Sequence, residues 1–156
     1  MLTRRSRARE VALQLLFQHD VNPNVPRAAI VRFAHNRLGK PEAEVFCLSL
    51  YDGTTSRLAE IDARLTAASE NWKLQRMAAS DRNVLRLGAY EIAFAAEPTP
   101  GPVALDEAIE LARRYGTADS PAFVNGVLDK VFREFSQQQG MKEEPNSAPT
   151  PIPPAA

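Results

Sequence analysis

Two groups of residues in this 156-residue chain have the types and spacing to bind an anionic polymer. The first is a run of arginines near the N-terminus, Arg4, Arg5, Arg7 and Arg9. Guanidinium groups bind phosphate through paired hydrogen bonds and also stack on bases. The run therefore predicts a cationic surface for phosphate, although a dense arginine cluster is equally typical of a solvated helix face.

The second group lies on the outer side of the last expected helix, where Asp119, Phe123, Gly126 and Lys130 follow one another at helical spacing. Such a surface suits single-stranded RNA. The Phe123 ring can stack on a base, the helix dipole favours phosphate, and Asp119 can accept hydrogen bonds from base edges. The alternative is that Phe123 packs under the loop after Gly116 and Asp119 only caps the helix.

The expected first helix has a second apolar stripe in addition to its main apolar arc. Leu13 and Phe17 lie one turn apart on the side away from that arc. Two interpretations stay open. Either the helix is packed between neighbours and both side chains are core, or the stripe is a protein-binding face with Phe17 as its aromatic anchor.

The sequence contains little that predicts catalysis. It has no glycine-rich phosphate loop and no GxSxG motif. The single Cys47 and the two histidines, His19 and His35, have neither catalytic nor zinc-site spacing. Ser120 precedes Pro121 and suits a helix cap better than a nucleophile. We therefore expect no enzymatic activity, no metal and no cofactor.

Composition and charge further limit the class of protein to which this chain can belong. The chain is 44% hydrophobic and 24% charged, which suits one domain of ordinary size. It contains neither an apolar run of about 20 residues nor a secretory signal, and its lone cysteine predicts a reducing cytoplasm. The net charge of zero hides an asymmetry, because residues 1–40 carry eight basic and two acidic side chains, a formal +6. The remainder carries −6, and this imbalance points to an anionic partner at one end.

Helical periodicity runs through most of the chain, and no strand is predicted. The helix over Arg82–Ala96 is apolar on most sides, so we expect it to be central and its Glu91 to be paired. Ser80 and Asp81 offer a cap for it. The other expected elements are Thr3–Asp20, Arg27–Leu38, a helix from Pro41 that Gly53 can interrupt, Leu58–Ala68, a short piece at Trp72–Met77, Val103–Tyr115, and a last helix from Ser120.

The C-terminal segment, residues 137–156, differs in composition from the rest. It contains five prolines and no periodicity, which predicts disorder. The sequence therefore divides into one helical domain over residues 1–136 and a proline-rich tail.

Four segments resemble the NusB transcription antitermination family. They are RSRAREVALQLLFQHD (5–20), DRNVLRLGAYEIAF (81–94), PVALDEAIELARRYG (102–116) and DSPAFVNGVLDK (119–130). The resemblance covers about residues 4–135, but between residues 22 and 77 only the helical layout matches. It implies an all-α fold of about six to seven helices in two small subdomains, without enzymatic activity. It also implies binding of boxA-type RNA from ribosomal RNA leaders, with the small-subunit ribosomal protein NusE as partner, in an antitermination complex with RNA polymerase.

The resemblance also assigns roles to single residues. It implies RNA contacts at Arg5, Arg7, Arg9, Asp119 and Phe123, while Arg4 joins by charge and Lys130 by its outward position. It implies partner contacts at Phe17 and Asp81, and Leu13 joins them by its place in the stripe.

Two other hypotheses remain beside that of an RNA-binding adaptor. Similar helical domains precede the catalytic domain of some ribosomal RNA cytosine methyltransferases, but we expect no methyl-donor-binding domain from this sequence. The other hypothesis is a protein-interaction or dimerisation module that uses the Leu13 and Phe17 stripe.

Overall fold

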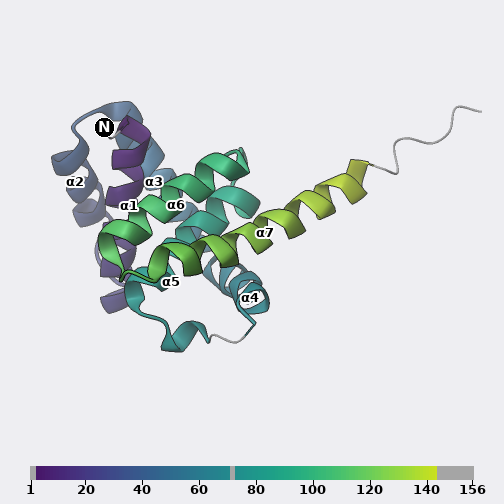
Figure 1. The fold of residues 1–156 in the computed structure, drawn as a ribbon. Helices are drawn as coiled ribbons and strands as arrows, with labels where there is room; N and C mark the ends of the chain where they lie inside the picture. Colours follow the sequence, from purple (N-terminus) through teal and green to yellow (C-terminus); the bar gives the residue numbers. More distant parts are fainter. Residues whose placement is uncertain (1–2, 71–72, 144–156) are drawn as a thin grey trace, which may run out of the picture.

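The computed structural model describes residues 3–70 and 73–143, and the side chains of residues 3–70 and 73–140. These ranges are helical with no strand, which confirms the predicted all-α fold (Figure 1). The elements are α1 (Arg4–Val21), α2 (Arg27–Leu38), α3 (Pro41–Ser56), α4 (Leu58–Ala68), the 3₁₀ turn η1 (Leu74–Arg76), α5 (Ala79–Ala89), the π-helical turn η2 (Tyr90–Phe94), α6 (Gly101–Tyr115) and α7 (Ser120–Glu143).

The helices pack as two groups that share one core. Helices α1, α2 and α3 pack on one another, and α4, α5, α6 and α7 form the second group. Helix α5 touches both α1 and α3 and so joins the groups. It is buried on nearly every side, as its apolar sequence predicted. The arginine-rich start of α1 lies at one end of this assembly, and the start of α7 lies near the other (Figure 1).

Three boundaries differ from the sequence-based expectation. Helix α5 begins at Ala79, so Ser80 and Asp81 lie inside its first turn and do not cap it. Its expected continuation to Ala96 changes at Tyr90 into a π-helical turn. Helix α3 continues through Gly53. A glycine is needed there because the Tyr90 ring packs against it; a Cβ atom would lie 2.0 Å from the ring carbon Cζ.

Helix α7 extends past the predicted domain boundary at residue 136. It continues to Glu143, and Gly140 has open space around it and does not end the helix. Residues 144–156, the rest of the predicted disordered tail, lie outside the described residues.

A polar network joins α1, α4 and α5 beside the core. Arg86 donates to both carboxylate oxygens of Asp62, at 2.8 and 2.9 Å, and to Asp20 at 3.0 Å. Asp20 also accepts from Asn83 at 2.8 Å and from Arg82 at 3.1 Å. Burial alone would raise the pKa of Asp20, but these hydrogen bonds and the two arginine charges outweigh burial and lower the pKa from 3.8.

We expect Asp20→Asn to flatten the acid dependence of stability. Since the folded-state pKa of Asp20 is below its ordinary 3.8, the unfolded chain takes up this proton first as the pH falls. The carboxylate therefore stabilises the fold above about pH 4, and this stabilisation is lost as the pH falls through the lowered pKa. Urea unfolding of both proteins between about pH 2 and pH 6 measures the difference. Asp106→Asn, at an exposed carboxylate of α6, should keep the wild-type slope, whereas a wild-type slope in Asp20→Asn would contradict the prediction.

Candidate nucleic-acid interface

The four N-terminal arginines have different environments in the structure. Arg4 and Arg5 are exposed, and within the described side chains neither has a carboxylate within 4.0 Å. Arg7 is half-buried and pairs with Glu10 at 3.2 Å. Arg9 lies one turn after Arg5 in α1, faces the protein interior and is only 3% exposed. Helical rotation thus divides the run into two free cations, one paired cation and one buried cation.

Arg9 forms a buried ion pair between α1 and η2. Its Nε lies 2.9 and 3.0 Å from the two carboxylate oxygens of Glu91, and its Nη2 lies 2.9 Å from Oε1. Thr99 donates to the same oxygen at 2.8 Å, and Arg9 Nη1 lies 3.5 Å from Glu107. The pairing expected for Glu91 is confirmed. The guanidinium of Arg9 is not at the surface in this conformation, which argues against the RNA contact expected there and for a structural role.

Arg5 is held against an aromatic ring at the surface. Its guanidinium carbon lies 4.5 Å from the centre of the Phe46 ring on α3, while Arg9 lies 5.2 Å from the same ring. A cation placed over an aromatic face keeps its charge and loses conformational freedom. Arg5 thus keeps its charge at the edge of an open hollow of about 700 Å³. Glu97 and Glu107 also line this hollow.

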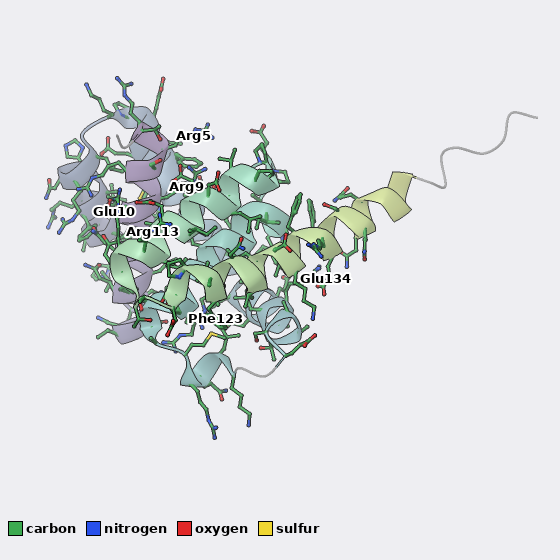
Figure 2. All side chains as sticks on the ribbon, in the orientation of Figure 1. Arg5, Arg9, Glu10, Arg113, Phe123 and Glu134 are labelled. Atoms are coloured by element: carbon green, nitrogen blue, oxygen red, sulfur yellow. The ribbon has the colours of Figure 1, made fainter. Side chains whose placement is uncertain are left out.

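Phe123 lies at the far end of the molecule from Arg5, near the start of α7 (Figure 2). It is half-buried and packs against the core, yet it also lines a hollow of about 390 Å³. The exposed Asp119 lines the same hollow. The two interpretations of Phe123 are therefore compatible, because part of the ring packs and part faces an open space. Ser120 does not show the expected capping bond; its Oγ accepts the backbone N–H of Thr117 at 2.9 Å.

Asp81 and Arg76 line the hollow beside Phe123 as well. The Oδ1 atom of Asp81 is buried and has no hydrogen-bond partner among the described residues, so it is unsatisfied in this conformation. The resemblance implies a protein-partner contact at Asp81, whereas the structure places this residue in one hollow with Asp119 and Phe123. Sequence reasoning missed Arg76, because the short turn η1 has no periodicity that predicts its neighbours. The positive charges of Lys73 and Arg76 in this short segment are the signal that could have indicated it.

Lys130 lies further along α7 and is already engaged. Its Nζ lies 2.5 Å from Oε1 of Glu70, and this bond and charge lower the pKa of the Glu70 carboxyl. Both residues line a second hollow, of about 350 Å³, together with Phe123 and Gly126. An RNA phosphate would therefore have to compete with Glu70 for this lysine.

The two residues of the apolar stripe on α1, Leu13 and Phe17, differ in burial. Leu13 is fully buried, so for this residue the core interpretation holds and the expected partner contact is corrected. Phe17 is half-buried, and its ring centre lies 5.9 Å from that of Tyr115. The Tyr115 hydroxyl donates to Glu10 at 2.8 Å, and burial together with this carboxylate raises its pKa. Phe17 therefore belongs to a polar and aromatic surface that joins α1 to α6.

The described residues contain no group of three His, Cys, Asp or Glu side chains that could hold a metal ion. Burial raises the pKa of the Cys47 thiol to about 12, so it is protonated at neutral pH. In the described part of the chain, no helix has both the length and the apolarity needed to cross a bilayer.

The fold and these surfaces define a small all-α protein of two packed helical groups, with free arginines at one end and an aromatic, acid-lined hollow at the other. Residues 6–133 match the NusB family. The transcription antitermination protein NusB of Solibacter usitatus is 44% identical over 147 residues, covering 93% of this chain and 94% of that protein. NusB of Bdellovibrio bacteriovorus is 42% identical over 130 residues, covering 83% and 96%. The chain belongs to the NusB family.

Solved structures agree with this assignment. T. maritima NusB superposes with a TM-score of 0.76 at 34% identity, covering 91% of this chain and 99% of that one. A crystal structure of antitermination factors NusB and NusE in complex with dsRNA gives a TM-score of 0.74 over 86% of this chain and all of that one. At 24% identity, this second likeness shows the shared fold alone.

Proposed function

We propose that this protein is a non-enzymatic adaptor of transcription antitermination that acts in the cytoplasm. In this role it binds boxA-type RNA together with the ribosomal protein NusE and joins them to the RNA polymerase complex. The curated relatives, which this chain matches over nearly their whole length, are named antitermination proteins. The observation that carries the proposal is the hollow in which Phe123, Asp119, Asp81 and Arg76 meet.

The hollow offers one group for each part of a nucleotide. Phe123 can stack on a base, and the exposed Asp119 can accept a hydrogen bond from the base edge. Asp81 lines the hollow beside Asp119 and adds a second carboxylate, which favours bases that carry amino or imino donors. Arg76 supplies a positive charge for the phosphate.

The other end of the molecule supplies electrostatic attraction. Arg4 and Arg5 are free to neutralise phosphates, whereas Arg7 first has to leave Glu10. Phe17 lies on α1 between the two ends, and we propose it as a contact for the protein partner. Because RNA and partner would bind adjoining surfaces, each would raise the local concentration of the other.

We expect Phe123→Ala to weaken binding of a boxA-like RNA strand by about 1–3 kcal/mol, which is the usual cost of losing one base–aromatic stack. Fluorescence anisotropy with this strand and with a scrambled strand of equal length measures the loss. Because every base has a π-face, the scrambled strand should also lose this stack, and any larger loss with the boxA-like strand measures base selection.

Phe135→Ala is the matched control, since Phe135 is a half-buried phenylalanine of the same helix outside the hollow. It should leave RNA affinity unchanged. If Phe123→Ala lowers the melting temperature by many degrees while affinity stays at the wild-type value, the ring has only a packing role.

A further inference from the structure

Most basic side chains of this protein are already neutralised by a neighbour. Among the described side chains, the majority of lysines and arginines have a carboxylate oxygen within 4.0 Å. Those without one are Arg4, Arg5, Arg32, Arg37, Lys40, Lys73 and Arg76. Arg76 lines the Phe123 hollow, Lys73 directly precedes η1, and the other five belong to the first 40 residues.

The three free cations of the second helix and its following turn are called the basic corner here: Arg32, Arg37 and Lys40. All three are exposed. Arg37 and Lys40 lie at the end of α2 and the start of α3, and the turn between these helices passes beside the N-terminus of α1 (Figure 1). Arg5 rests on Phe46, which lies six residues after Lys40 in α3, about 9 Å along the helix axis.

The acidic groups near the basic corner are mostly engaged elsewhere. Asp52 binds Arg27 at 2.5 Å, and Glu44 lies 2.6 Å from Nδ1 of His35. Glu42 is the remaining carboxylate in the first turn of α3. Even when the carboxylates of Glu42 and Glu44 are both counted, the three cations leave the corner with a surplus of positive charge.

One of these cations is also held in place. The guanidinium carbon of Arg37 lies 3.6 Å from the centre of the Phe33 ring one turn earlier in α2. As with Arg5 on Phe46, an aromatic ring orients an arginine that has no acidic partner. Two ring-supported arginines with free charges at one end of the molecule are suited to phosphate groups spaced along a chain.

We infer that the basic corner continues the phosphate-binding surface of Arg4 and Arg5, so that the RNA strand extends over the α2–α3 turn. The occupant is the phosphodiester backbone of the same strand, bound without selection of its bases. The inference rests on the proposed function. Charge complementarity and continuity with Arg4 and Arg5 support it, as does the large positive excess of the first 40 residues.

The test compares a boxA-like RNA strand with the same strand lengthened by about six uridines at its 5′ end or at its 3′ end. At low salt, the wild type should bind one of the longer strands about tenfold more tightly than the short one. The triple variant Arg32→Gln/Arg37→Gln/Lys40→Gln should bind the short strand within about twofold of the wild type and gain nothing from either extension.

Salt dependence gives an independent readout. Each phosphate neutralised on a single strand adds about 0.7 to the slope of log affinity against log salt, so three contacts make the wild-type slope on the longer strand steeper by about two. The triple variant should lack this increment. Melting curves by circular dichroism check that it folds, which is expected because all three side chains are exposed.

The control variant Arg57→Gln/Arg64→Gln/Arg133→Gln removes the same charge from arginines that already have acidic partners. It should keep the gain from the longer strand. The inference is overturned if neither extension strengthens wild-type binding, or if the triple variant keeps the full gain. Loss of affinity for the ribosomal partner protein, without any effect of strand length, also overturns it and assigns the corner to a protein.

The same strands separate this inference from the proposed function. If the wild type does not distinguish the boxA-like strand from a scrambled one, the sequence-selective function fails. The gain from lengthening the scrambled strand, and its loss in the triple variant, would still support the basic corner.

Discussion

Arg9→Ala is expected to lower the free energy of unfolding by about 3–5 kcal/mol, because it leaves Glu91 buried without its cation. The side chains of Arg9 and Glu91 are only 4% and 3% exposed, and the pair is held by several contacts near 3 Å. After the substitution, Thr99 remains as a hydrogen-bond donor to Glu91. Urea or guanidinium unfolding measures the loss.

Arg5→Ala is the matched control for this prediction. Arg5 belongs to the same arginine run but is exposed, so its loss should change stability by about 0.5 kcal/mol or less while weakening RNA binding. The double variant Arg9→Met/Glu91→Leu should recover most of the stability, since two apolar side chains leave no buried charge. If Arg9→Ala instead keeps wild-type stability and loses RNA affinity, Arg9 leaves its buried position to bind RNA.

The buried pair also has a consequence for the cationic end of the molecule. Arg9 ties α1 to Glu91 of η2, one turn away from Arg5 and next to the ring of Phe46. It thereby fixes the rotation of α1 that leaves Arg4 and Arg5 exposed. We interpret Arg9 as a positioning residue for its neighbours.

Leu128→Ala is expected to cost about 2–5 kcal/mol of folding free energy, the usual cost of a leucine cavity in a packed core. Leu128 is fully buried between α7 and α5. A Cβ atom on Gly88 would lie 2.5 Å from its Cδ1, so this leucine also explains the glycine. Chemical unfolding measures the cost, and Val45→Ala, at a side chain that is 69% exposed, should change stability by about 0.5 kcal/mol or less.

The contact between Gly88 and Leu128 predicts that Gly88→Ala lowers stability in the wild type and raises it in the Leu128→Ala protein. In the wild type, the added methyl group meets Leu128 and costs about 1–3 kcal/mol. In the Leu128→Ala protein, the methyl group enters the vacated space and should recover stability, helped by the better helix propensity of alanine. A double-mutant cycle measures this coupling. Additive effects would show that the core rearranges around either change.

Local signals in the sequence predicted much of the fold. Apolar residues at helical spacing predicted the seven α-helices of the described residues, and proline at the start of α3 and α6 marked where these helices begin. The expected burial and pairing of Glu91 followed from its place on the inner arc of an apolar helix. These features depend on residues within one or two turns of each other, which a single sequence displays directly.

The positions of the functional side chains depended on contacts between distant segments. Periodicity placed Arg5 and Arg9 together as cations, but Glu91, 82 residues later, makes Arg9 part of the interior. The periodicity of the sequence could not show that Asp81 and Arg76 line one hollow with Phe123. Nor could it show that Leu13 is covered on its outer side.

The sequence by itself therefore determined the helices, the family and the charge excess at one end. Tertiary structure alone decided which charges are free, because a charge becomes available to a ligand only where packing brings no opposite charge to it. Among the described side chains, Arg4, Arg5 and the basic corner have no acidic partner, whereas Arg9 is paired with Glu91 and stabilises the fold.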